Sequence, residues 1–303
     1  MESVIQFLGE ESNNFCYMMR EDLIPYSFGG NKARKGKLFF HEIDKGDYDC
    51  VVTYGCSHSN HCRIVGNMAS ARNMECYIIG PNSVSDCTNN SRLMVCFGAE
   101  IHSVPVESVS DTIDALLNDL KESGKNPYFI PGGGHGNLGT QAYVECYEEI
   151  KAYETSNNIG FDYICFASGT GTTHAGLVCG QIKNCDERII VGISIARKNP
   201  HGRNVVIESI KEYMPYVSLE EIQKKTIFID AYIGNGYGKN NEDIINTIKY
   251  MMIKYGIPMD TTYTGKAFWG MKEYLKENQI HGKNILFIHT GGTPLFFDDL
   301  IKW

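Results

Sequence analysis

The sequence predicts an α/β protein with two lobes, each built on a doubly wound, mainly parallel sheet. Short runs rich in β-branched, aromatic and cysteine residues alternate with longer amphipathic stretches. Runs such as Cys50–Tyr54 and Tyr163–Ala167 are apolar on both faces, which is typical of strands buried between two layers of helices. Right-handed β-α-β crossovers between such strands produce a doubly wound sheet.

The elements follow one another in this alternation. The expected strands are Cys50–Tyr54, Cys76–Ile79, Glu100–Val104, Tyr128–Ile130, Tyr163–Ala167, Ile189–Ile195, Thr226–Ile229 and Ile285–His289. The expected helices are Asn60–Arg72, Asn89–Phe97, Asp111–Ser123, Leu138–Thr155, Thr172–Ile182, Gly202–Met214, Asn241–Tyr255 and Lys266–Glu277. No internal repeat or low-complexity linker marks a border between the lobes.

Composition limits the function. The 303 residues are 43% hydrophobic, which is ample for a core, and the net charge of −8 gives no electrostatic support for a nucleic-acid or anionic-membrane partner. No apolar run approaches the roughly 18–20 residues that span a bilayer. The N-terminus Met1-Glu2-Ser3-Val4-Ile5 lacks the basic and apolar regions of a signal peptide.

The eleven cysteines are scattered singly and never spaced Cys-x-x-Cys. We expect reduced core residues of a cytoplasmic protein. The nearest metal-like cluster is Cys56, His58, His61 and Cys62, but its spacing matches no standard zinc pattern, so no metal is expected.

Three loops that follow expected strands carry the informative motifs. They are Ser57–His61, Gly132–Gly139 and Ser168–Thr173. Because ligands of such sheets bind at the carboxyl ends of the strands, we expect one shared site.

The segment Phe28–Lys35 contains a Gly-Gly pair, which lets the backbone turn tightly beside a flat ligand and present Lys32. The alternative is an ordinary surface lysine. Gly169-Thr170-Gly171-Thr172-Thr173 has the glycines, hydroxyls and helix N-terminus that suit a phosphate, although an ordinary strand–helix turn is the alternative. A presented lysine, the Ser59-Asn60 turn and this cradle together indicate a pyridoxal phosphate (PLP) enzyme.

Two further motifs are weaker. Gly134–Gly139 formally matches the dinucleotide fingerprint, but the acidic residue Asp162 lies at the wrong end of the next strand, so we expect a tight turn rather than an NAD site. Tyr237 and Tyr263 each have a glycine nearby, which favours loops facing a cleft over aromatic packing.

On these motifs the chain resembles the D-cysteine desulfhydrase / 1-aminocyclopropane-1-carboxylate (ACC) deaminase family of tryptophan-synthase-β-like, fold type II PLP enzymes. The resemblance runs from about Tyr17 to Phe297. The segments that carry it are Arg20–Leu23, Phe28–Lys35, Ser59–His61, Gly169–Gly176, Asn235–Asn241, Tyr263–Lys266 and Ile288–Gly292.

The resemblance implies a role for each matching residue. Lys32 would bind PLP covalently, Asn60 would hydrogen-bond its 3′-oxygen, and Ser59 would lie beside the substrate. Gly169, Thr170, Gly171, Thr172 and Thr173 would hold the phosphate, helped by Lys35. Tyr263 would lie against the pyridine ring with Tyr237 nearby, and Thr264 would meet the pyridine nitrogen.

Two positions divide the family. ACC deaminases have a glutamate where this chain has Thr264 and a leucine where it has Thr290. A carboxylate keeps the pyridine nitrogen protonated and strengthens the electron sink that ring opening needs, whereas a threonine does not. We therefore expect α,β-elimination from a small amino acid, giving pyruvate, ammonia and the leaving group, with Lys32 or a tyrosine as the base.

The chain also departs from the family. Gly55-Cys56-Ser57-His58 replaces the usual Gly-Gly-Ile/Val-Gln in the loop that cradles the substrate carboxylate. His58, His61 and Lys37 add possible cations, so a cysteate sulfo-lyase-like reaction on an anionic substrate is an alternative. The sequence is also compatible with β-replacement, with ACC deamination, with a non-enzymatic PLP-binding protein and with a nucleotide-binding protein.

The resemblance also implies an overall organisation. We expect a large PLP-binding domain of residues 1–44 plus 137–303 and a small domain of residues 45–136, with PLP in the inter-lobe cleft. A homodimer, and closure of the smaller lobe over the substrate, are further expectations of this kind.

Overall fold

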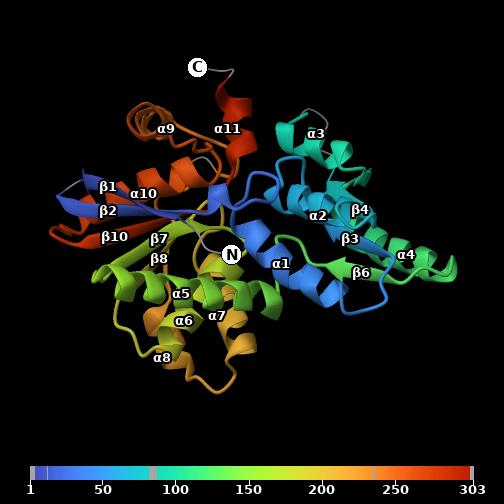
Figure 1. Ribbon diagram of the computed structural model, residues 1–303, viewed down its shortest axis with the longest axis horizontal. Helices are drawn as coiled ribbons and strands as arrows, with labels where there is room; N and C mark the ends of the chain where they lie inside the picture. Colours follow the sequence, from blue (N-terminus) through green and yellow to red (C-terminus); the bar gives the residue numbers. More distant parts are fainter. Residues whose placement is uncertain (1–3, 12, 82–86, 235, 301–303) are drawn as a thin grey trace.

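The computed structural model describes residues 4–11, 13–81, 87–234 and 236–300. Residues 1–3, which begin the segment tested for a signal peptide, and the quoted Asn235 lie outside these ranges. The chain forms two separate sheets flanked by helices (Figure 1). In the described ranges, no helix is long and apolar enough to cross a membrane.

The larger sheet has six strands in the order β1-β2-β10-β7-β8-β9. They are β1 (Val4–Glu11), β2 (Asn14–Arg20), β7 (Tyr163–Ser168), β8 (Ile189–Ser194), β9 (Ile227–Ile229) and β10 (Asn284–His289). Its helices are α5 (Asn137–Asn157), α6 (Thr172–Lys183), α7 (His201–Tyr213), α8 (Leu219–Lys225), α9 (Glu242–Tyr255), α10 (Thr264–Glu277) and α11 (Thr293–Leu300). Only β1 and β2 pair antiparallel among these described strands.

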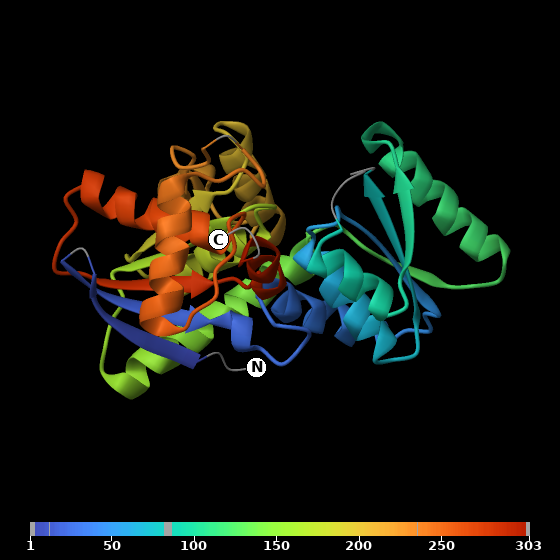
Figure 2. The same cartoon turned by 90° about the horizontal axis from the view of Figure 1, so that it is seen from above.

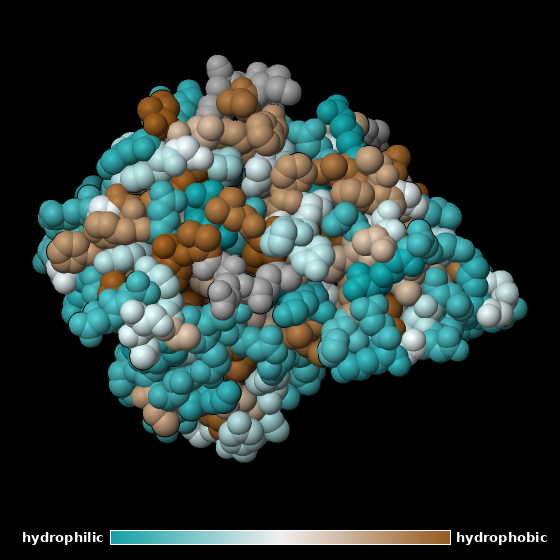
Figure 3. Space-filling model, viewed as in Figure 1, coloured by the Kyte–Doolittle hydropathy of each residue, from teal (hydrophilic) through white to brown (hydrophobic). Residues whose placement is uncertain are grey.

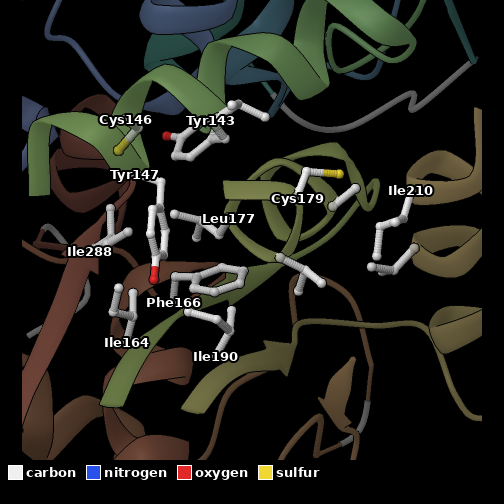
Figure 4. Packing of buried hydrophobic residues seen from close by; sticks show 14 of the residues in the cluster. Tyr143, Cys146, Tyr147, Ile164, Phe166, Leu177, Cys179, Ile190, Ile210 and Ile288 are labelled. Atoms are coloured by element: carbon white, nitrogen blue, oxygen red, sulfur yellow. The ribbon is translucent and has the colours of Figure 1, made fainter. Parts of the chain in front are cut away.

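Each face of the larger sheet is covered by its own apolar cluster. One cluster packs α5, α6 and α7 on the sheet, and Figure 4 shows Tyr147 and Leu177 of these helices beside Phe166 of β7. The other cluster packs α9 and α10 on the opposite face. Burial on both faces explains why the central strands are apolar throughout.

The smaller sheet has four parallel strands in the order β5-β4-β3-β6. They are β3 (Cys50–Tyr54), β4 (Glu75–Pro81), β5 (Glu100–Val104) and β6 (Pro127–Ile130), with helices α2 (Asn60–Ser70), α3 (Asn89–Cys96) and α4 (Val109–Glu122). Figure 2 shows the two sheets standing apart, with the smaller sheet at one end of the molecule. The predicted α/β class with mainly parallel sheets is therefore confirmed.

Helix α1 (Asn31–Ile43) lies between the two sheets (Figure 1). Its apolar residues Ala33, Phe39, Phe40 and Ile43 join the core under the smaller sheet. The same helix also contacts α5 beside the larger sheet. Residue 32 is thus fixed at the start of a helix that touches both halves.

The elements that follow the expected alternation are present, with ends shifted by a few residues. The β1–β2 hairpin and helices α1, α8 and α11 were not predicted from the sequence. The pairing of β1 with β2 shifts register between Phe7 and Gly9, so the strand lacks a regular pattern. Helix α1 begins directly after Gly29-Gly30, which we read only as a turn.

The face of the molecule in Figure 3 is largely hydrophilic, with hydrophobic residues in scattered groups. This surface agrees with a chain that has a net charge of −8 and hides its apolar residues in the clusters described above.

Candidate active site

A cavity of about 350 Å³ opens between the two sheets. The loops after β3, β6, β7 and β8 line it together with the start of α1, so the carboxyl ends of strands from both sheets meet there. The predicted site residues that line it are Lys32, Ser59, Asn60, His61, Gly169, Thr170, Gly171, Thr173, Tyr237, Tyr263 and Thr290. Lys35, Thr172 and Thr264 are not among the lining residues.

Lys32 lies in the first turn of α1 and reaches into this cavity. Its Nζ donates a hydrogen bond to the carbonyl of Gly133 at 2.9 Å. Burial of the amine lowers the pKa of Lys32 to about 8. About a tenth of this amine is therefore unprotonated at pH 7, compared with less than about a thousandth for an ordinary lysine, and the unprotonated amine is the form that attacks a carbonyl group.

The two glycines before Lys32 allow close contact with the chain's own backbone. Gly29 has φ +57°, and a Cβ there would lie 2.8 Å from the carbonyl oxygen of Asp22. Gly30 has φ +99°, and a Cβ there would lie 2.7 Å from the carbonyl oxygen of Thr290. The pair therefore lets the loop close on these two segments, and the expected flat ligand is not needed to explain it.

The turn between β7 and α6 presents a helix N-terminus to the cavity. Gly171 is the N-cap of this twelve-residue helix, and no side chain caps it. By contrast, the Ser59 hydroxyl caps α2 by accepting from the Cys62 amide at 3.1 Å. The uncapped N–H groups of α6, with the hydroxyls of Thr170 and Thr173, form a donor set that suits a phosphate.

Lys35 stands behind this donor set. Its Nζ donates to Thr172 Oγ1 at 2.6 Å, and both side chains are buried. Burial, reinforced by the nearby Lys32, lowers the pKa of Lys35 well below its usual range. Any help that Lys35 gives to a phosphate therefore passes through Thr172.

The amide of Asn60 is oriented by its neighbours. Its Oδ1 accepts from Asn90 Nδ2 at 3.0 Å and from Arg63 Nη2 at 3.4 Å. Asn90 Nδ2 also donates to the carbonyl of His58 at 3.0 Å. With Oδ1 engaged, the amide offers Nδ2 to the cavity, which is the donor that a cofactor oxygen requires.

His61 is held in the neutral form by its surroundings. Thr53 Oγ1 donates to the carbonyl of Ile130 at 2.7 Å, so it must accept the hydrogen of His61 Nε2 across their 2.9 Å contact. Burial, with Lys32 and Lys35 nearby, lowers the pKa of His61 well below its usual range. The imidazole is therefore neutral, so His61 is not one of the possible cations on which the cysteate alternative depends.

Tyr237 and Tyr263 bring their phenols together at the cavity wall. The two Oη atoms lie 2.5 Å apart, and the rings meet edge to face at 5.9 Å between centroids. Burial raises the pKa of both tyrosines. Cys56 Sγ contacts Tyr237 Oη at 3.8 Å.

The two threonines that divide the family occupy different positions. The Thr264 hydroxyl donates to Asp260 Oδ1 at 2.8 Å and is buried away from the lining residues. Thr290 lines the cavity. Among the described residues, no aspartate or glutamate lines the cavity.

Several lining residues were not predicted as site residues, among them Asn31, Cys56 and Gly133, which lie in the loops that the sequence singled out, and Arg197, which lies outside them. Asn31 Nδ2 donates to Thr173 Oγ1 at 3.1 Å, and Arg197 Nη1 donates to the carbonyl of Thr170 at 3.2 Å. Arg197 follows β8, so the rule that ligands bind at strand carboxyl ends would have found it.

The glycine-rich motif that resembles a dinucleotide fingerprint does not line the cavity. Gly134–Gly139 is absent from the lining and forms a tight turn, in which a Cβ on Gly134 would meet the Lys35 side chain at 3.3 Å. Across the described ranges, no group of three or more histidine, cysteine or acidic residues is placed to hold a metal ion.

The residues of this cavity fit PLP. A helix N-terminus without a side-chain cap and hydroxyl donors suit its phosphate, Asn60 Nδ2 suits its ring oxygen, and the amine of Lys32 suits its aldehyde. Gly133 leaves the room that this amine needs, because a Cβ there would lie 3.3 Å from Lys32 Nζ.

Comparison with known proteins agrees with this geometry. The family model described as pyridoxal-phosphate dependent enzyme matches residues 5–291. D-Cysteine desulfhydrase of Yersinia pestis (strain Pestoides F) is 31% identical over 301 residues, covering 96% of this chain and 89% of the relative. D-Cysteine desulfhydrase of Serratia proteamaculans (strain 568) is 30% identical over 303 residues, with the same coverage of 96% and 89%.

Solved structures show the same fold. A structure described as an ACC deaminase homologue has a TM-score of 0.87 and 31% identity, covering 100% of this chain and 93% of that one. A hydrogen sulfide-producing enzyme from Fusobacterium nucleatum has a TM-score of 0.65 and 19% identity, covering 96% of this chain and 95% of that one. The second likeness concerns the fold alone.

Proposed function

The chain belongs to the family of pyridoxal-phosphate-dependent enzymes, and from this premise we propose that it is a lyase that catalyses α,β-elimination on a small amino acid. The proposed substrate is D-cysteine, which with one water gives pyruvate, ammonia and hydrogen sulfide. The desulfhydrases that are 30–31% identical to this chain support this choice of substrate.

One observation supports elimination over ring opening. Hydroxyl, amide and thiol groups line the cavity, and no carboxylate does so among the described residues. Without a carboxylate, nothing in this wall holds a proton on a pyridine nitrogen, which leaves a weaker electron sink. A weak sink is sufficient when a good leaving group departs from Cβ as the Cα proton is lost.

We propose the following roles for the residues. When bound, PLP supplies a ring that takes up electron density from Cα of the substrate. Lys32 attaches the cofactor, because its amine has a pKa of about 8 and faces the cavity. Asn60 and the N-terminus of α6 hold the ring oxygen and the phosphate, and Ser59 lies beside the substrate. Thr290 lines the cavity and is the threonine that we assign to the ring nitrogen in place of Thr264, whose hydroxyl is bound to Asp260 outside the lining.

The direct test is keto-acid release by the PLP-loaded protein. D-Cysteine, L-cysteine, L-cysteate, D-serine, β-chloro-D-alanine and ACC are offered in parallel. Pyruvate from D-cysteine, with sulfide in equal amount, is the expected result. Pyruvate from L-cysteate alone, or 2-oxobutyrate from ACC, would assign a different substrate, and no keto acid from any of them would contradict a lyase.

Variants on one helix give the control. Lys32→Ala should abolish both keto-acid release and the visible absorption of the lysine-bound cofactor. Lys37→Ala removes an exposed lysine of the same helix and should change neither. The position of Lys37 outside the cavity lining, together with the neutral His61, also weakens the cysteate alternative.

β-Replacement is distinguished by adding a second nucleophile. A small thiol supplied with D-cysteine or β-chloro-D-alanine should leave pyruvate release unchanged if water completes the reaction. A thioether amino acid formed at the expense of pyruvate would instead favour a replacement enzyme.

We further propose the domain division at residues 1–44 plus 137–303 and 45–136, a homodimer, and a cytoplasmic location. All eleven cysteines are free, and seven are buried, which supports a reducing compartment. The mass of the protein in solution, measured by light scattering, tests the dimer.

A further inference from the structure

Cys56 extends the tyrosine pair into a row of three groups that can exchange protons. Its Sγ lies 3.8 Å from Tyr237 Oη, and Tyr237 Oη lies 2.5 Å from Tyr263 Oη. The three residues come from separate segments, namely the loop after β3, the loop before α9 and the N-cap of α10. All three line the cavity, so the row opens onto the place where the substrate must bind.

The three groups differ in how readily they carry negative charge. Burial raises the pKa of Tyr237 and of Tyr263, so neither phenol holds a negative charge easily. Burial alone would also raise the pKa of Cys56, but hydrogen bonds with His58 and Tyr237 outweigh it and lower that pKa below the ordinary thiol value. Sulfur is therefore the member of the row that ionises first.

The neighbours of Cys56 support this assignment. His58 on the same loop favours the thiolate through hydrogen bonds and charge. Cys62 on α2 is fully buried, and burial raises its pKa to about 12, so it stays a thiol. In the family pattern the position of Cys56 is occupied by glycine, so the thiol is a departure made by this chain.

Resting on the proposed lyase function, we propose that Cys56 is the terminal proton acceptor of a Cys56–Tyr237–Tyr263 path that removes the Cα proton of the substrate. Tyr263 takes the substrate proton as its own proton passes to Tyr237, and the proton of Tyr237 passes to sulfur. One C–H and two O–H bonds break while two O–H bonds and one S–H bond form. The electron pair of the C–H bond stays with the substrate, and no oxidant or reductant is required.

The reverse transfer resets the row. The thiol returns its proton through Tyr237 and Tyr263 to the sulfur that leaves Cβ, so that hydrogen sulfide departs and Cys56 is again a thiolate. The proton taken from Cα thus leaves with the product, and the path needs no net change of charge.

Alkylation tests the thiol independently of any activity. Iodoacetamide reacts with the thiolate, so its rate at Cys56 in the PLP-loaded protein, followed by peptide mass mapping, should rise with pH and level off below the value near 8.5 typical of a free cysteine. In Tyr237→Phe the midpoint should move upward, because one hydrogen bond to the thiolate is lost. A midpoint at or above that of a free cysteine would overturn the proposal.

Kinetics tests the path. Cys56→Ala and Tyr237→Phe should each lower kcat/KM for D-cysteine by about a hundredfold or more, since positioned proton transfer contributes roughly 10²–10⁴-fold. The double variant should be no slower than the slower single variant, because the two residues act as one path. Each single variant should also lose or displace the acid limb of the pH profile, where the wild type gains activity as Cys56 loses its proton.

The controls separate this inference from the proposed function. Cys96→Ser replaces an exposed cysteine at the end of α3 and should leave the rate and the pH profile unchanged. If the wild type releases pyruvate while Cys56→Ala keeps its rate and acid limb, the path is wrong and the lyase stands. If the wild type releases no keto acid although Cys56 titrates as described, the lyase is wrong, and the path falls with it.

Discussion

The Asn60 amide shows how single residues prepare this cavity. Asn90 and Arg63 hold its Oδ1, and Arg63 is buried with its Nε atom lacking a partner. Burial lowers the pKa of Arg63 to about 9, so keeping this side chain in the core is costly. We infer that Arg63 is kept behind Asn60 because it helps to turn the Asn60 Nδ2 donor toward the cavity.

Asn90→Ala should weaken cofactor binding without removing any group that lines the cavity. The amide of Asn60 loses one hydrogen bond worth about 1 kcal/mol, so the Kd for PLP should rise about fivefold. Asn89→Ala, next to it but outside the Asn60 network, is the matched control. Fluorescence titration of cofactor-free protein with PLP measures both, and equal effects would contradict a specific role for Asn90.

The lowered pKa of Lys32 makes the unfolding free energy of the cofactor-free protein depend on pH. Its pKa is about 8 in the folded protein and about 10.4 in an unfolded chain, so between these values the unfolded chain binds more protons. The unfolding free energy of cofactor-free protein should therefore rise with pH across this window. In Lys32→Met the rise should be smaller by roughly 2 kcal/mol, as measured by urea unfolding at pH 8 and pH 10. An identical rise in both proteins would contradict the lowered pKa.

Gly133→Ala separates backbone strain from a collision. The new Cβ would lie 2.6 Å from Thr170 Cγ2 and 3.3 Å from Lys32 Nζ, at φ +73°. Gly124→Ala has φ +87° with no atom within 4 Å, so both variants should lose about 1 kcal/mol of stability through strain. Only Gly133→Ala should also weaken PLP binding, by about tenfold or more, because overpacking costs about 1–3 kcal/mol.

The strands and helices that were predicted correctly are those whose hydrophobic residues repeat with a regular local period. The central strands are apolar on both faces, and their helices show the longer period, so both were found with nearly correct ends. Helix α1 was missed because Gly29-Gly30 and three nearby basic residues resembled a loop, whereas Ala33, Phe39, Phe40 and Ile43 define its buried side. The β1–β2 hairpin was missed because β2 gains its place by pairing with β10, more than 250 residues later.

The candidate site also has features that the sequence predicts and features that depend on the folded chain. Loops at strand ends could be placed from the sequence, and most of the predicted residues line one cavity. The contacts of Thr264 with Asp260 and of Cys56 with Tyr237 join segments that only the folded chain brings together. A neutral His61 could not be predicted either, since its charge depends on burial beside Lys32 and Lys35.

The cap of α2 yields a prediction at this scale. Ser59→Ala removes the hydroxyl that accepts from the Cys62 amide and should cost about 1 kcal/mol of stability. Ser218→Ala removes the equivalent cap of α8 at the Glu221 amide, which is not part of the cavity lining, and should cost about the same. Only Ser59→Ala should lower kcat/KM with D-cysteine, and equal losses of activity would contradict a role beside the substrate.

Helix α1 connects the core of the smaller sheet to that of the larger sheet, and it uses a different side of the helix for each. Its apolar side lies under the smaller sheet, while Arg34 points to the other half. Arg34 Nε donates to Glu21 Oε1 and Arg34 Nη1 to Glu149 Oε1, both at 2.7 Å. Glu21 is fully buried and follows β2, and Glu149 belongs to α5, so this ion pair fixes the helix that carries Lys32 to the larger sheet.

Arg34→Met should therefore disturb stability and cofactor binding together. It leaves the buried Glu21 carboxylate without its cation, which costs about 3–5 kcal/mol. Arg72→Met removes a partly exposed ion pair with Asp44, a hydrogen bond to the Met68 carbonyl and a contact with the Phe40 ring, but it strands no buried charge and should cost less, about 1–2 kcal/mol. Adding Glu21→Gln to Arg34→Met removes the stranded charge and should restore part of the stability, measured by urea unfolding. Because the double variant still lacks the link between α1 and α5, its affinity for PLP should stay low. Full recovery of both properties would mean that the apolar side of α1 alone positions Lys32.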